Sequence, residues 1–191
     1  TELSQAKWAL RRLLGDYVRG IESSYFGIID MWYATEGVNR KGLIYSLPDQ
    51  TVDHPKEAYF ALQNLFAVID SSVTVDSGLA VSSSHFLPIS IHGLRHHGLP
   101  LVVLWEDHAT PTNTIVKSPV DLVVGETFQY PVYIDLRTGE LLAIGDEGWT
   151  TSGGSTTFTS IPVYDSPVLI AELAAIQSIN REARIRAWQW R

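Results

Sequence analysis

The chain has 191 residues, 45% hydrophobic and 18% charged, and its 14 Lys and Arg against 21 Asp and Glu give a formal net charge of −7. This composition predicts a folded globular protein with a sizeable core, and the acidic balance argues against nucleic acids and anionic membranes as partners, since both attract clustered Lys and Arg. Cysteine is absent, which excludes disulfides and thiolate chemistry, and no apolar run approaches the ~20 residues that a membrane-spanning helix needs.

The first third of the chain has the pattern of an α/β protein. Apolar residues recur every three to four positions at Leu3, Ala6, Leu10, Leu13, Leu14 and Tyr17. This spacing predicts an amphipathic helix with Lys7, Arg11 and Arg12 on its other face. Residues 25–33 are apolar on both faces and predict a strand covered on both sides, and a second helix is predicted over 55–69. This order of elements is typical of the end of an α/β barrel or a doubly wound sheet.

The chain from 71 to 173 changes to short β-rich runs without helical periodicity. The runs cover residues 84–92, 99–107, 121–124, 129–136, 141–144, 156–163 and 168–173. Residues 96–98 and 137–139 have the composition of hairpin turns. These signals predict an antiparallel sandwich or barrel of six or seven strands. Residues 174–191 have weak helical periodicity and are predicted to form a docking tail or a frayed end.

Five segments carry a resemblance to one family. Ser4–Arg12 resembles the seventh helix of the catalytic barrel in the large clan (clan A) of (β/α)8 glycoside hydrolases. Phe26–Tyr33 resembles the eighth barrel strand, and Pro55–Leu65 is similar to the eighth helix, which often precedes the exit of the chain from the barrel. Pro100–Trp105 and Pro162–Val168 resemble strands of the small sandwich that often follows the barrel.

The resemblance implies an α+β fold. Residues 1–69 are then the last βα units of a (β/α)8 barrel, residues 70–173 an antiparallel β-sandwich of about seven strands, and residues 174–191 a C-terminal tail with helical periodicity. Two of eight barrel units leave unpaired strand edges. We therefore expect a complementary polypeptide that carries the rest of the barrel, or a homo-oligomer. The start of the chain almost inside a helix agrees with a fragment or a processed product.

The function that the resemblance implies is that of the C-terminal part of a glycoside hydrolase acting on glycosidic bonds. Its main catalytic carboxylates would lie on a missing or separate chain, so the isolated chain is expected to be inactive. A carbohydrate is the expected substrate, no cofactor is expected, and the family implies an extracellular or periplasmic, secreted protein. The alternative is a non-catalytic carbohydrate-binding or assembly module built on the β-sandwich.

The candidate site residues lie near the first helix and at the end of the predicted strand. Barrel active sites form at the carboxyl ends of the strands, and the resemblance places Asp30, Trp32, Tyr33 and Glu36 there as substrate-binding residues. Trp32 would stack on a sugar ring, although a core position is the alternative. Glu2 is the one candidate for a catalytic nucleophile, against the simpler role of an acidic residue at a helix N-terminus.

A group of histidines and acidic residues raises the question of a metal site. Its members are His92, His96, His97, Glu106, Asp107 and His108. Imidazole and carboxylate are suitable zinc ligands. However, His96 and His97 are consecutive at a predicted hairpin tip, where extended backbone directs neighbouring side chains apart. The sequence therefore predicts exposed turn histidines and no metal site.

Overall fold

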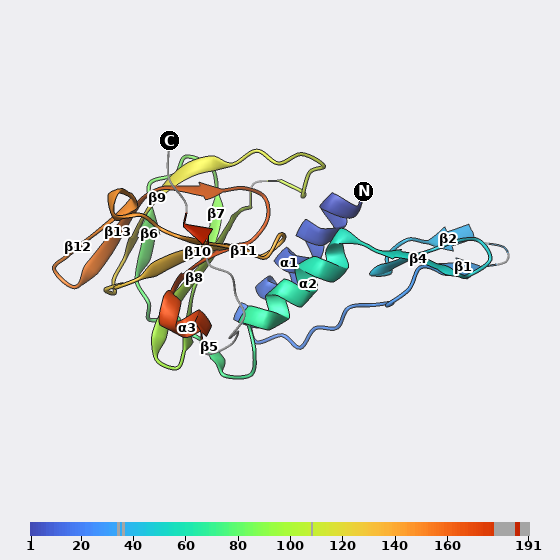
Figure 1. Ribbon diagram of the computed structural model, residues 1–191, viewed down its shortest axis with the longest axis horizontal. Coiled ribbons are helices and arrows are strands. Elements are labelled where there is room, and N and C mark those ends of the chain that lie inside the picture. The colour runs from blue at the N-terminus through green and yellow to red at the C-terminus, as the bar shows by residue number, and fades with distance from the viewer. Residues whose placement is uncertain (34, 36, 108, 178–185, 188–191) are drawn as a thin grey trace.

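The computed structural model describes residues 1–33, 35, 37–107, 109–177 and 186–187 (Figure 1). Two helices, α1 (Glu2–Val18) and α2 (Glu57–Val68), pack on one sheet, and a second sheet covers the opposite face of the first. The seven-stranded sheet has the order β15 (Arg186–Ala187), β11 (Glu140–Ala143), β10 (Pro131–Asp135), β14 (Val168–Glu172), β8 (Leu99–Glu106), β7 (Ile89–His96) and β5 (Val73–Val75). The four-stranded sheet has the order β12 (Trp149–Ser152), β13 (Ser155–Val163), β9 (Ser118–Val124) and β6 (Val81–Ser83).

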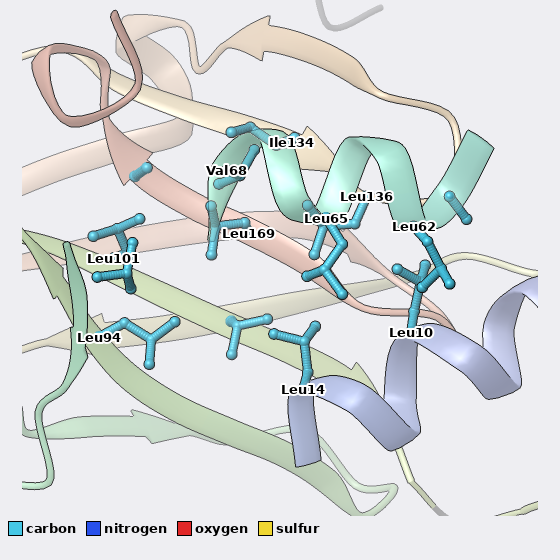
Figure 2. Close-up of a cluster of buried hydrophobic side chains, with 14 of the residues drawn as sticks. Leu10, Leu14, Leu62, Leu65, Val68, Leu94, Leu101, Ile134, Leu136 and Leu169 are labelled. Carbon is cyan, nitrogen blue, oxygen red and sulfur yellow. The ribbon is translucent and has the colours of Figure 1, made fainter. Parts of the chain in front are cut away.

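The seven-stranded sheet is the middle layer, and its strands are therefore apolar on both faces. In β8, Leu101 and Val103 join the cluster under the helices, whereas Val102 and Leu104 join the cluster between the two sheets. Side chains of a strand alternate between faces, so a strand covered twice needs a continuous apolar run. Figure 2 shows the helix side of this core, where α1 and α2 meet the sheet. The fold is an α+β fold of mainly antiparallel sheets, and the described residues contain no closed barrel.

The predicted strands of the sandwich are present. Each of the seven predicted β-rich runs overlaps one strand, namely β7, β8, β9, β10, β11, β13 or β14. Both predicted turns connect neighbouring antiparallel strands, and His97, Gly98 and Gly139 have the positive φ values that tight turns require. The strands β5, β6 and β12, of three or four residues each, were not predicted.

The face of α1 predicted to be polar is partly buried, which corrects the sequence-based expectation. Lys7 is fully buried, and its Nζ lies 2.6 Å from Asp165 Oδ1 and 2.6 Å from the carbonyl oxygen of Thr114. Arg11 forms an ion pair with Asp107 on the same side. Segments of the sandwich thus contact the polar side of α1. Periodicity alone does not predict these contacts, because the partner residues are more than 90 positions away in the sequence.

Residues 20–55, here called the arm, differ most from the prediction. They carry β1 (Met31–Tyr33), β2 (Gly37–Asn39), β3 (Ile44–Ser46) and β4 (Val52–Pro55), and both hairpins lie at the end of the helices remote from the sandwich (Figure 1). The buried strand predicted over 25–33 is not formed. Phe26 and Ile28 are exposed, Ile29 makes a single parallel bridge to Ile44, and only the last three residues are a strand. Burial of this segment is therefore only partial: Asp30 is buried and Trp32 is half-buried, whereas the apolar side chains of Phe26 and Ile28 are mostly exposed.

The end of the chain is described only in part. A short helix, α3 (Leu173–Gln177), agrees with the helical periodicity at the start of the predicted tail, and a 3-10 turn (Asp146–Gly148) precedes β12. Residues 178–185 and 188–191 lie outside the described part of the chain. No helix in the described part is long and apolar enough to cross a membrane.

Candidate functional site

A cavity of about 1140 Å³ lies between α1 and the arm. Its walls are rich in aromatic and hydrogen-bonding side chains: Thr1, Glu2, Ser4, Gln5, Trp8, Ala9, Arg12, Tyr25, Phe26, Tyr33, Val38, Asn39, Arg40, Lys41, Tyr45 and Lys56. Such a combination of apolar surface with a few polar groups is typical of ligand pockets. Two of the sequence-predicted site residues, Glu2 and Tyr33, are in this wall, whereas Asp30 and Trp32 are not among the described lining residues.

One face of α1 supplies the helical wall of the cavity. Glu2, Gln5, Trp8 and Arg12 follow one another at intervals of three or four residues, so their side chains lie on the same face of the helix. Trp8 is 53% exposed although it is one of the largest apolar side chains of the chain. Its indole ring is thus available to a ligand in the cavity.

Gln5 attaches the arm to this face. Its side-chain amide nitrogen donates hydrogen bonds to the Tyr25 hydroxyl at 2.9 Å and to the carbonyl oxygen of Gly42 at 2.9 Å. Gly42 also approaches the backbone of Asp30 so closely that a Cβ would lie 2.3 Å from the Asp30 nitrogen. Any larger residue at this position would push apart the two segments that form the floor of the arm.

Asp30 is buried beneath the cavity wall, where it holds the arm together. Its carboxylate accepts hydrogen bonds from Lys56 Nζ at 2.6 Å, from Arg40 at 3.2 Å and from the backbone N–H of Gly42 at 3.1 Å. Lys56 is itself buried and begins α2 as its N-cap residue. Buried charges are found with partners of this kind because desolvation disfavours an isolated ion. The contacts give Asp30 a positioning role behind the site.

Trp32 is half-buried and is covered by protein groups. Its indole N–H donates to Ser46 Oγ at 3.0 Å, and the guanidinium of Arg40 lies 4.9 Å from its ring and 4.2 Å from the ring of Tyr45. These are cation–π distances. Tyr33, the next residue along β1, is exposed and faces the cavity. The remaining predicted residue, Glu36, lies outside the described part of the chain.

Glu2 lies at the edge of the cavity with both carboxylate oxygens engaged. Oε1 is 2.9 Å from His54 Nε2, and Oε2 accepts a hydrogen bond of 3.2 Å from the backbone N–H of Glu57. Lys56 gives α2 no side-chain cap, so the Glu2 carboxylate satisfies a free N–H at the positive end of that helix. The hydrogen bond to Glu2, followed by that to Asp53, raises the pKa of His54.

Sequence reasoning missed four aromatic residues of the cavity, Trp8, Tyr25, Phe26 and Tyr45. Tyr25 and Phe26 fell within a run predicted to be a buried strand, and Trp8 was taken as part of an ordinary amphipathic helix. The available signal was the position of Trp8, which falls off the apolar stripe of Leu10 and Leu14. A large aromatic residue outside the core-facing stripe of a helix indicates an exposed contact surface.

The histidine group does not converge. His96, predicted to be exposed, is buried, and its Nδ1–H donates to the carbonyl oxygen of Ala175 at 2.5 Å. His97 is exposed in the turn, and His108 lies outside the described residues. Within the described ranges, no three His, Asp or Glu side chains are placed to hold a metal ion.

Comparisons with known proteins show a structural likeness but no family. No protein-family model matches the chain, and no curated protein matches it. A solved structure of a cycloisomaltooligosaccharide glucanotransferase from Paenibacillus sp., complexed with cycloisomaltoheptaose, is similar over 60% of this chain with a TM-score of 0.46 and 11% sequence identity. The similar region spans 21% of that enzyme's chain, about a fifth of its length.

Proposed function

We propose that this chain is the C-terminal part of a glycoside hydrolase-type enzyme and forms one wall of its carbohydrate site, braced by the sandwich. The observation that carries the proposal is the aromatic wall of the cavity. Trp8, Phe26 and Tyr33 come from two elements and are each at least two-fifths exposed. Sugar rings present an apolar C–H face that packs on aromatic rings, and the polar side chain of Asn39 in the same wall can hydrogen-bond sugar hydroxyls.

The remainder of a barrel is the partner that we propose for the exposed apolar side chains of the arm and of α2. Large apolar side chains are exposed on the arm and on α2, at Ile21, Phe26, Ile28, Ile29, Tyr59, Phe60 and Phe66. Large exposed apolar surfaces mark interaction sites. Residues 25–33 have the pattern of a strand covered on both faces, and the outer helices and the packed interior of a barrel would cover them. In this proposal the main catalytic carboxylates lie on that other polypeptide, and the whole protein is secreted.

Carbohydrate binding by the chain is the first test. Saturable binding of neutral gluco-, xylo- or manno-oligosaccharides, followed by tryptophan fluorescence and NMR, is expected for the unmodified protein. Trp8→Ala is expected to weaken the binding about tenfold, equivalent to ~1.4 kcal/mol. Phe86→Ala removes an aromatic side chain that is 84% exposed outside the cavity and is expected to leave the affinity unchanged. If no oligosaccharide binds, neither these neutral ones nor acidic ones, or if the two variants behave alike, the proposal is wrong.

A non-catalytic carbohydrate-binding module is the second candidate, and one observation favours it. Glu2 is the only acidic residue among the described lining residues, whereas retaining glycosidases need two carboxylates ~5–5.5 Å apart. Both candidates predict that the isolated chain does not hydrolyse aryl glycosides. Mass spectrometry of the native protein distinguishes the two candidates. Only the first candidate predicts that a polypeptide carrying the rest of the barrel is covalently linked to this chain or co-purifies with it. Hydrolysis by the 191-residue chain alone would contradict both.

A further inference from the structure

A second cavity, of about 550 Å³, adjoins α1 and is here called the arginine cleft. It is bounded by α1, by β7 and β8, and by residues 109–111, and its lining includes Arg11, Arg12, Arg19, Ser90, His92, Trp105 and Asp107. Three guanidinium groups thus gather in one cleft of a chain whose formal charge is −7. A local surplus of positive charge in a concave site attracts anions.

The three arginines differ in how completely they are neutralised. Arg11 forms an ion pair with Asp107 and donates to the carbonyl oxygen of Ala109 at 2.9 Å. Arg12 and Arg19 share one carboxylate, that of Asp16, over 3.7 and 3.4 Å, and their side chains are more than half exposed. Among the described residues, the two carboxylates of Asp107 and Asp16 therefore pair with three guanidinium groups. The excess positive charge lies at Arg12 and Arg19.

His92 adds a titratable group to the cleft. Its ring is half-buried against Trp105, with 5.4 Å between the ring centroids. Burial, and after it the charge of Arg19, lowers the pKa of His92, and Asp107 only partly opposes this. An anion bound beside Arg11, Arg12, Arg19 and His92 would favour the charged imidazolium and raise that pKa.

The arginine cleft shares two residues with the larger cavity between α1 and the arm, here called the aromatic cavity. Trp8 and Arg12 line both, and they are one helical turn apart on α1, a rise of about 6 Å. A ligand that stacks on Trp8 therefore reaches the cleft with its next unit. This continuity links the charge of the cleft to the carbohydrate site.

We propose that the arginine cleft binds the anionic group of an acidic glycan, a carboxylate or a sulfate ester, whose neighbouring ring lies on Trp8 in the aromatic cavity. The inference rests on the proposed function and names its substrate class. Arginine suits this task, because its planar, permanently charged guanidinium forms paired hydrogen bonds with carboxylate and sulfate oxygens. The uncharged polar groups of the aromatic cavity then bind the hydroxyls of the neighbouring sugar.

The test compares glycans that differ only in charge. Glucuronic-acid-containing xylo-oligosaccharides and oligogalacturonates are titrated as free acids and as methyl esters of the same length, together with sulfated xylo-oligosaccharides. At least one acidic form is expected to bind about tenfold more tightly than its uncharged counterpart, and to raise the pKa of His92 measured by NMR. A preference for the uronates assigns the cleft to a carboxylate, and a preference for the sulfated form assigns it to a sulfate ester.

Two variants separate a specific site from overall charge. Arg19→Gln is expected to lower the affinity for the preferred acidic glycan about tenfold. Ser152→Asp changes the net charge by the same amount at an exposed position on β12 and is expected to have no effect. If acidic and neutral forms bind equally, or if both variants weaken binding alike, the inference is wrong while the proposed function stands. If no glycan of either kind binds, both are wrong.

Discussion

Strand β8 and residues 25–33 have nearly the same apolar pattern and opposite surroundings. β8 runs through the middle layer, where the helices cover one face and the second sheet covers the other, and Leu101 to Leu104 are fully buried. In the arm, Phe26 and Ile28 are more than 60% exposed. An apolar run in the sequence therefore indicates a segment suited to burial, but it does not identify the residues that pack against it.

The same contrast extends to the way in which the two regions are held. The helices and the sandwich share a continuous hydrophobic cluster that includes residues of α1, α2 and the five strands β5, β7, β8, β10 and β14. The arm instead depends on polar anchors: Asp30 with Lys56, Gln5 with Gly42, and Glu2 with His54. The helices and the two sheets are here called the body. We therefore expect mutations in the body to destabilise the whole molecule and mutations in the arm to have local effects.

The largest effect is expected at the buried ion pair between α1 and the sandwich. Lys7→Met leaves Asp165 in a buried site without its cation, and breaking such pairs costs ~3–5 kcal/mol of unfolding free energy. Arg12→Met changes the same helix at an exposed position and is expected to alter stability by less than about 0.5 kcal/mol. Urea denaturation of both variants measures the difference.

The same pair sets an acid limit to stability. Burial, the strongest single influence, raises the pKa of Asp165, but the hydrogen bonds from Lys7 and Thr112 together outweigh it, and the pKa is lowered. The stabilisation is therefore present above the unfolded-state value, about 3.9, and is lost as pH falls through the lower folded-state value. Equal stability of Lys7→Met and the unmodified chain at neutral pH would contradict the proposed role of the pair.

A smaller difference tests the comparison of the two apolar runs directly. Leu104→Ala is expected to cost ~2–5 kcal/mol, because Leu104 is fully buried between the sheets. Ile28→Ala is expected to change stability by less than about 0.5 kcal/mol in the isolated chain, because its side chain is largely exposed. A large cost at Ile28, measured in the same urea titration, would mean that the arm is packed within this chain, and the case for a covering partner would fail.

The sequence predicts elements with their own periodicity better than it predicts contacts between them. Helices α1 and α2 and the seven long strands follow from apolar spacing and turn residues such as Gly98 and Gly139. The burial of Lys7 and the inward position of Asp30 depend on partners far along the chain, at Asp165 and Lys56. Of the predicted site residues, Tyr33 and Glu2 lie in the cavity wall, whereas Trp8 on α1 could be assigned to that wall only from the three-dimensional arrangement.

The smallest expected effect is at His54, an exposed residue that links the arm to both helices through Glu2. The hydrogen bonds to Glu2, first, and to Asp53, second, raise its pKa above the usual value of about 6.5. Because the folded-state pKa is raised, the hydrogen bonds of His54 stabilise the arm fully below the unfolded-state pKa. This stabilisation is lost as pH rises through the higher folded-state pKa.

Glu2→Gln is expected to lower the pKa of His54, as measured by NMR, and to speed hydrogen exchange at the Glu57 amide, which Glu2 accepts from. Asp53→Asn retains the contact with Glu2, so it is expected to lower that pKa less and to leave the Glu57 amide protected. A global loss of stability in Glu2→Gln, equal to that in Lys7→Met, would remove the distinction between a hydrophobically packed body and a polar-anchored arm. Local opening alone would show that the arm can detach while the core stays folded.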